Sequence, residues 1–159
     1  MREPADFRVV PADTPERWEG VLHIRQRVFA EEQSLVDLGI TDADDPASLT
    51  LVGLAADRPV STGRLTPAQS GRAAYLSWIA TLPEYRGRGY GSSVVEQLVA
   101  AADARGYQEL QLAAQAHAVS LYMRFGFARL GQPYVVRGIS HQAMYRIHPS
   151  EVRSRFTRR

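Results

Sequence analysis

The sequence contains no cysteine and no lysine, and each absence excludes a class of function. Without cysteine the chain can form no disulfide bond, no thiolate metal site and no cysteine nucleophile. Without lysine it lacks the Gly-Lys-Ser/Thr segment that a P-loop requires. No stretch approaches the roughly 18 to 20 uninterrupted apolar residues of a membrane-spanning helix. The first ten residues include four charged ones and no apolar core, so we expect no signal peptide, no membrane contact and a cytoplasmic location.

The composition is otherwise that of an ordinary compact domain. The chain has 159 residues, of which 45% are hydrophobic and 23% charged, values typical of one folded domain. We expect this domain to cover residues 1–148. Four arginines stand within the last seven positions, so residues 149–159 are predicted to form a basic, flexible tail. The net charge is only +2 and the other arginines are dispersed, which argues against a nucleic-acid partner.

Apolar runs and turn residues give an order of secondary-structure elements. Strands are predicted over 7–12, 49–55, 59–65, 73–82, 109–113, 134–139 and 143–147, and helices over 15–32, 90–105 and 116–125. Thr14 is the expected N-cap of the first helix, with Pro15 at its first position. Antiparallel strands therefore come first, and a strand–helix–strand–helix unit follows. This order favours a mixed sheet with helices on both faces.

A glycine-rich loop at Arg86–Gly91 joins a predicted strand to a predicted amphipathic helix. Glycine lets the backbone adopt positive φ and lets a ligand approach without meeting a Cβ atom. The free amides and the dipole of a helix N-terminus favour a phosphate group, and Arg86 and Arg88 add positive charge. A dinucleotide-binding turn needs an early β-α-β unit and the spacing Gly-x-Gly-x-x-Gly, which are absent here. By itself the loop is a phosphate-binding candidate or a tight connection.

The spacing Arg86-x-x-Gly89-x-Gly91 after a strand resembles the acetyl-coenzyme A motif of the GCN5-related N-acetyltransferase (GNAT) superfamily. A second segment is similar to a later helix of that superfamily, in which an asparagine opens the segment, a tyrosine follows seven residues on and Gly-Phe ends it. Gln115 stands in the place of the asparagine here, and Tyr122 and Gly126-Phe127 match. Two motifs in the right order and separation make the resemblance specific.

Finer features resemble the ElaA-like branch of that superfamily. They are Arg25-x-x-Val28-Phe29-x-x-Glu32-Gln33, the acidic loop with Asp42 and Asp45, Ala114–His117, and Gly138–His141 followed by Met144. Ser140 and Ser48 depart from the branch, which often has proline and histidine there. The resemblance covers about residues 7–147. It implies an α/β (α+β) fold with a mixed, mostly antiparallel, six- to seven-stranded sheet flanked by about four helices.

The resemblance also implies that acetyl-coenzyme A is the acyl donor. The residues implied to bind it are Ile79, Ala80, Thr81, Arg86, Gly87, Arg88, Gly89, Tyr90, Gly91, Ser92, Gln115 and Tyr122. The implied reaction is direct attack of an amine on the thioester, with Tyr122 as the acid beside the departing sulfur. A phenol with an ordinary pKa of about 10 is protonated at neutral pH and can donate this proton. Packing of Tyr122 in the core is the alternative interpretation.

The sequence does not single out the general base. The strand predicted at 73–82 lacks the glutamate that often serves as the base in the superfamily. Glu32, His117 and His141 remain; the two histidines are the favoured candidates, and each has a structural role as its alternative. Glu32 and Gln33, together with the two histidines, are the expected acceptor-binding residues. Asp42, Asp44 and Asp45 lack the EF-hand pattern, so we expect a solvated turn and no metal site.

The favoured function is an acetyl-coenzyme A-dependent N-acetyltransferase that acts on a primary amine of a small molecule or peptide. A non-catalytic module that binds acyl-coenzyme A is the first alternative, because the strand has lost its acid. A relative of acyl-homoserine-lactone synthases is the second, suggested by the Arg25–Glu32 segment alone. An arginine-rich RNA binder is the most distant reading, and a homodimer is left open.

Overall fold

The computed structural model describes residues 6–34 and 39–151, so the predicted tail from residue 152 onward lies outside the described residues. Two compact units are present. The first comprises the described parts of 1–66 together with 78–98, and the second comprises 67–77 together with the described parts of 99–159. The division passes through the strand β4 (Ala73–Thr81) and the helix α2 (Tyr90–Ala104).

The first unit is built on antiparallel strands. β1 (Phe7–Pro11) pairs with β2 (Leu49–Ala55), which pairs with β3 (Arg58–Pro67), and the final part of β4 follows β3. The β2–β3 hairpin turns at Ala56 and Asp57, whose φ angles are +47° and +63°. Two consecutive residues with positive φ match the right-handed twist of the flanking strands. The predicted hairpin is confirmed.

The first helix, α1 (Pro15–Arg25), begins where the sequence predicts. The hydroxyl of Thr14 accepts a hydrogen bond from the amide of Arg17 at 3.2 Å, which satisfies one free donor of the first turn. The chain continues without a break into a π-helix, η1 (Gln26–Glu32). The predicted end near Glu32 is therefore confirmed, although the hydrophobic pattern did not reveal the wider helical turn.

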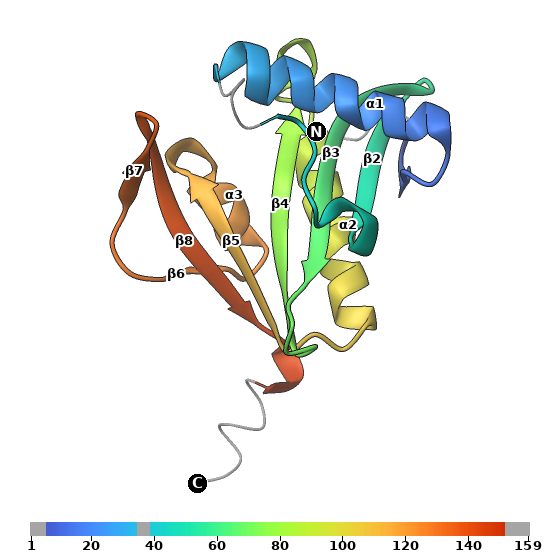
Figure 1. Cartoon of the computed structure of the whole chain (residues 1–159). Helices are drawn as coiled ribbons and strands as arrows, with labels where there is room; N and C mark the ends of the chain where they lie inside the picture. Colours follow the sequence, from blue (N-terminus) through green and yellow to red (C-terminus); the bar gives the residue numbers. More distant parts are fainter. Residues whose placement is uncertain (1–5, 35–38, 152–159) are drawn as a thin grey trace, which may run out of the picture. The chain divides into compact units, whose positions relative to one another are not determined.

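The helices of the first unit lie on both faces of its strands. Val21, Ile24 and Val28 of α1 and η1 form a buried core with Val52, Leu54, Ala80 and Leu82, and Figure 1 shows α1 running across the strands. The start of α2 packs on the other face, because a Cβ atom at Gly63 of β3 would lie 2.8 Å from Leu98 and 3.0 Å from Val94. Glycine at position 63 thus lets α2 approach the strand closely.

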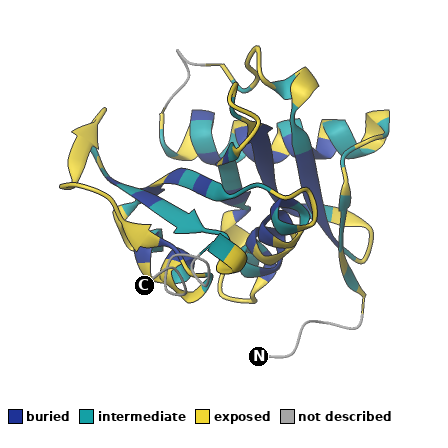
Figure 2. Ribbon diagram, turned by 90° about the horizontal axis from the view of Figure 1, so that it is seen from below, coloured by how far each residue is buried: buried dark blue, intermediate teal, exposed yellow. Residues whose placement is uncertain are grey.

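The second unit has its own strand order. The first residues of β4 pair in parallel with β5 (Glu109–Gln115), and β5 pairs antiparallel with β8 (Ile139–Ile147). β6 (Ala128–Arg129) and β7 (Tyr134–Val136) both pair with β8, and this stretch of chain is exposed in Figure 2. A short helical turn, η5 (Ala116–Ala118), leads into α3 (Val119–Arg124).

Arg146 of β8 fixes the end of α3. Its guanidinium donates to both carboxylate oxygens of Asp103, at 2.8 and 2.9 Å, and to the carbonyl oxygen of Phe125 at 3.1 Å. One side chain therefore satisfies a helix-terminal carbonyl group and joins α3 to the last turn of α2 within the second unit.

The predicted fold class is confirmed, because the strands form a mixed, mostly antiparallel sheet flanked by helices. Across the part of the chain that the structure describes there are eight strands, rather than six or seven. The additional strand is the two-residue β6, which is too short for a hydrophobic pattern to indicate. No helix among the described residues is long and apolar enough to cross a membrane.

Candidate functional site

The glycine-rich loop lies between η4 (Pro83–Tyr85) and the N-terminus of α2. Gly87 and Gly89 have φ angles of +77° and +84°, a conformation that disfavours any side chain. Tyr90 begins the helix and is buried, with its ring stacked on that of Phe7 at 4.4 Å between centroids. The side chain of Tyr90 belongs to the core. Only its backbone therefore remains for the predicted contact with a cofactor.

Two observations indicate that the loop can bind an anionic group. The first amides of a helix have no partner within the helix, and α2, with fifteen residues, is long enough for its dipole to favour negative charge there. A Cβ atom at Gly91 would also lie 2.9 Å from the hydroxyl oxygen of Thr81. A side chain at position 91 would fill the space between the loop and the end of β4, so glycine keeps this approach open.

The two arginines of the loop differ in their partners. Arg86 donates to both carboxylate oxygens of Glu32 at 2.8 Å, and its Nε donates to the carbonyl oxygen of Thr81 at 3.1 Å. The guanidinium of Arg88 lies 5.5 Å from the centroid of the Tyr85 ring and pairs with no acid in the described chain. The charge of Arg86 is thus compensated, whereas that of Arg88 is available to a ligand.

A second bidentate ion pair joins the π-helix η1 to η4, directly before the loop. Arg27 donates to the carboxylate oxygens of Glu84 at 2.7 and 3.1 Å, and these hydrogen bonds lower the pKa of the Glu84 carboxyl. Arg27 and Glu32 are five residues apart, which places them one turn apart on the π-helix η1. The π-helix therefore presents one positive group to η4 and one negative group to the loop. Glu32, which the sequence predicts to bind the acceptor, holds Arg86.

The acidic loop carries an ion-pair network around the buried carboxylate of Asp45. Asp42 and Asp44 are exposed, so the expected solvated turn holds for these two acids and is wrong for Asp45. Arg25 is fully buried and donates to both carboxylate oxygens of Asp45 at 3.1 Å and to the carbonyl oxygen of Ile40 at 3.0 Å. Arg64 donates to Asp45 at 3.0 Å and to Asp42 at 2.6 Å. Two buried guanidinium groups require these counter-charges, and this is the physical reason for the acids.

Trp78 of β4 completes this network. Its indole N–H donates to the second carboxylate oxygen of Asp42 at 3.1 Å. Partial desolvation alone would raise the pKa of the Asp42 carboxyl, but the hydrogen bonds from Arg64 and Trp78 outweigh it and lower this pKa to about 2. Asp42 is therefore a carboxylate at any pH near neutrality.

This pKa predicts how acid destabilises the protein. The pKa of Asp42 is about 2 in the folded state and 3.8 ordinarily, so its contribution to stability is complete above about pH 4 and is lost as the pH falls toward 2. Urea titrations between pH 5 and 2.5 should show a steeper loss of unfolding free energy for the wild type than for Asp42→Asn. Asp44→Asn removes a neighbouring carboxylate and should keep the wild-type slope. Equal slopes for all three proteins would contradict the assignment.

Tyr122 lies on α3 in the second unit and is buried, with its ring edge-on to that of Phe127 at 6.0 Å between centroids. Burial raises the pKa of its phenol above the ordinary value of 10. No residue in the described ranges hydrogen bonds to its hydroxyl group. Tyr122 is thus both a core residue and a protonated phenol with a free donor.

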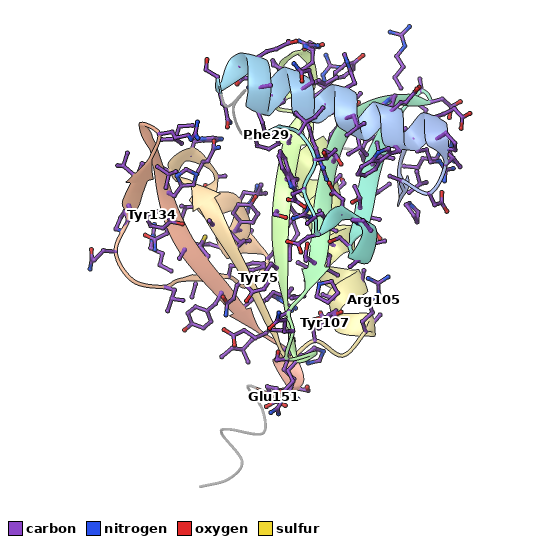
Figure 3. All side chains as sticks on the ribbon, in the orientation of Figure 1. Phe29, Tyr75, Arg105, Tyr107, Tyr134 and Glu151 are labelled. Atoms are coloured by element: carbon purple, nitrogen blue, oxygen red, sulfur yellow. The ribbon has the colours of Figure 1, made fainter. Side chains whose placement is uncertain are left out.

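The other predicted residues of the second unit lie around the ends of β5 and β8. Gln115 and His141 are directly opposite each other in the β5–β8 pairing. The ring of His141 stacks on that of Tyr134, 5.7 Å away between centroids, and Nδ1 of His141 lies 2.8 Å from the carbonyl oxygen of Ile139 (Figure 3 labels Tyr134). His117 is exposed on η5. The structure therefore brings Gln115 and His141 together, with His117 two residues beyond Gln115.

The predicted residues thus fall into two groups. Glu32, Gln33, Ile79, Ala80, Thr81 and the loop through Ser92 belong to the first unit, and Gln115, His117, Tyr122 and His141 belong to the second. Ala80 contributes its side chain to the core beneath α1, so only its backbone remains for a ligand. No cluster of three or more histidine or acidic side chains within the described ranges is arranged to bind a metal ion.

Comparison with known proteins places these features in a family. The Acetyltransferase (GNAT) family profile matches residues 18–127, a span that includes both the glycine-rich loop and Tyr122. UPF0039 protein sll0451 of Synechocystis sp. is 34% identical over 137 residues, which cover 82% of this chain and 86% of that protein.

Solved structures share the fold. A putative N-acetyltransferase from Lactobacillus plantarum has a TM-score of 0.79 at 23% identity, covering 89% of this chain and 98% of that chain. Escherichia coli ElaA has a TM-score of 0.77 at 21% identity, covering 88% and 97%. A GNAT family acetyltransferase from Elizabethkingia anophelis with acetyl-CoA bound has a TM-score of 0.65 at 13% identity, covering 91% and 99%. At these identities the likeness shows the fold alone.

Proposed function

The chain belongs to the acetyltransferase (GNAT) family, and from that premise we propose that it transfers an acetyl group from acetyl-coenzyme A to a primary amine of a small molecule or peptide. The observation that carries the proposal is the loop with positive-φ glycines at the N-terminus of α2, which suits the diphosphate of the cofactor. The bound acetyl-CoA in the Elizabethkingia anophelis structure supports the choice of donor.

Each part of the loop has its own role in this proposal. The amides from Gly87 to Ser92 donate to the diphosphate, and Arg88 supplies the uncompensated positive charge. Arg86 keeps the loop in place through Glu32 and the carbonyl oxygen of Thr81. The backbone of Ile79–Thr81 pairs with the pantetheine arm, as the resemblance implies, while Gln115 is a further cofactor contact.

Tyr122 acts as the acid in the proposed reaction. The acceptor nitrogen attacks the thioester carbonyl carbon, the C–S bond breaks, and the phenol proton of Tyr122 passes to the departing sulfur. The buried, protonated phenol with a free donor supports this role. His117 and His141 are the candidate bases that take the proton of the amine. Together with Glu32 and Gln33 they are the proposed acceptor contacts.

The lack of cysteine makes a direct test of turnover simple. Acetyl-CoA is incubated with a panel of primary amines, and free thiol is measured with a chromogenic disulfide; because the protein has no thiol, every thiol detected is released coenzyme A. We expect amine-dependent release for at least one class of amine, and a loss of rate in His117→Ala or His141→Ala that identifies the base. Tight coenzyme A binding without thiol release from any amine would instead favour the non-catalytic module.

Cofactor binding is tested separately by calorimetry with coenzyme A. We expect Arg88→Gln to weaken binding about tenfold, because one charge-assisted contact to a phosphate is lost. Arg8→Gln is the matched control, since Arg8 is an exposed arginine of the same unit that pairs with Asp57 at 2.9 Å. Equal loss of affinity in both variants would show that only the net charge of the protein matters. Unchanged affinity in both variants would contradict a phosphate contact by Arg88.

A further inference from the structure

Trp78 has an unusual backbone conformation. It lies inside the strand β4, yet its φ angle is +53°, the left-handed region that a bulky aromatic residue rarely adopts. Such strain persists only where the surrounding structure holds it. Trp78 directly precedes Ile79–Thr81, the segment that the proposed function assigns to the pantetheine arm. The groups that hold Trp78 therefore affect how this segment is presented.

Three side chains, which we name the Trp78 clamp, hold the indole ring. The carboxylate of Asp42 accepts the indole N–H at 3.1 Å, and the guanidinium of Arg25 lies 4.6 Å from the ring centroid. The ring of Phe29, labelled in Figure 3, is edge-on at 5.1 Å between centroids. A hydrogen bond, a cation–π contact and an aromatic pair thus fix three sides of one ring.

The clamp cannot rearrange easily, because its charged members are fixed in turn. Arg25 is fully buried, contacts the rings of both Trp78 and Trp18, and pairs with Asp45. Arg64 holds the other oxygen of Asp42. Arg25 and Trp18 belong to α1, Phe29 belongs to η1, and Arg64 belongs to β3. Asp42 and Asp45 belong to the acidic loop. Four of them, Arg25, Phe29, Asp42 and Asp45, are positions by which the sequence resembles the ElaA-like branch, and the proposed function gives these four no role.

We propose that Arg25, Phe29 and Asp42 are positioning residues that act through Trp78 to set the backbone of Ile79–Thr81 for the acyl donor. A left-handed residue within a strand turns the peptide groups that follow it, as a β-bulge does. The side chains on either side of the next peptide are fixed as well, since Ile79 faces α2 and Ala80 lies in the core beneath α1. This inference rests on the proposed function, because it assigns a purpose to the same donor site.

A double-mutant cycle on Asp42 and Trp78 tests the inference by calorimetry with coenzyme A. Trp78→Phe keeps an aromatic ring between Arg25 and Phe29 but removes the N–H donor, and Asp42→Ala removes the acceptor. We expect each single variant to weaken binding about tenfold. The double variant should bind no more weakly than either single variant, because Asp42 acts through the indole.

Two controls separate positioning from stability. Asp44→Ala removes a neighbouring acid outside the clamp, and we expect unchanged affinity. Val21→Ala trims the fully buried core beneath α1, so we expect a lower melting temperature with unchanged affinity. Hydrogen exchange of the indole N–H, followed by NMR, should be slow for Trp78 in the wild type and fast in Asp42→Ala, a change that a general loss of stability does not single out.

The outcomes are distinguishable. Wild-type affinity in both single variants, or effects that add in the double variant, would overturn the clamp and leave the proposed function standing. Failure of the wild type itself to bind coenzyme A would overturn the proposed function, and the inference with it. Weakened binding in Val21→Ala equal to that in Asp42→Ala would also overturn the clamp, because stability alone would then explain the loss.

Discussion

Replacing Asp45 by alanine is expected to lower the free energy of unfolding by about 3–5 kcal/mol, since a buried charge then loses its partner. The carboxylate of Asp45 is 8% exposed and the side chain of Arg25 is 0% exposed, so water cannot replace the lost contact. Arg25 already has one buried nitrogen, Nε, without a partner among the described residues, and the substitution would leave the whole guanidinium without a counter-charge.

The measurement is urea denaturation at neutral pH, with the unfolding free energy extrapolated to water. Asp44→Asn serves as the matched control, because it removes an exposed acid from the same loop, and its effect should stay within about 0.5 kcal/mol. A loss below about 1 kcal/mol in Asp45→Ala would show that the network is solvated, as the sequence first suggested.

A paired replacement distinguishes a lost charge from lost packing. Arg25→Met combined with Asp45→Leu removes both members of the ion pair and fills their volume with apolar atoms. Buried ion pairs replaced in this way are often neutral or stabilising, so we expect the double variant to be more stable than Asp45→Ala. The Trp78 clamp would lose its cation in that protein, and weaker coenzyme A binding in a stable protein would then support the positioning role.

The fold was largely predictable because its signals are local. Thr14-Pro15 predicts the start of α1 from capping chemistry alone, and Ala56–Arg58 between two apolar runs predicts the β2–β3 hairpin. Gly106, with a φ of +77°, ends α2 where a C-terminal glycine is expected. Each of these features needs only a few neighbouring residues, which a single sequence displays.

The candidate site was predictable only in part, because its remaining contacts join distant residues. The two sequence motifs predict the loop and Tyr122. No residue close to Asp42 in sequence indicates its hydrogen bond to Trp78, which is 36 positions away. Glu32 and Arg86 are likewise 54 positions apart, so the sequence could present Glu32 only as a free acid near the acceptor. The sequence did contain one usable signal. Three acids close together, in a chain rich in apolar strands, indicate that buried arginines elsewhere in the chain need counter-charges.

Tyr122→Phe is expected to lower kcat about a hundredfold while leaving the affinity for acetyl-CoA unchanged, the loss typical of a missing general acid. Phenylalanine keeps the ring and its edge-on contact with Phe127, so the melting temperature should change little. Tyr75→Phe is the matched control, since Tyr75 is 44% exposed and lies outside the proposed chemistry. Steady-state rates with the best amine of the panel, together with calorimetry, provide the measurement.

The pH profile gives a second, independent reading of the same residue. Burial raises the pKa of Tyr122 above its ordinary value of 10, so the phenol keeps its proton throughout the range in which the enzyme is assayed. Loss of the acid form would remove activity only as the pH rises through this raised pKa. Any decline of the wild-type kcat below about pH 10 should therefore come from another group and persist in Tyr122→Phe. A decline near neutrality that disappears in Tyr122→Phe would contradict the burial argument, and unchanged turnover in Tyr122→Phe with intact acetyl-CoA binding would remove Tyr122 from the chemistry.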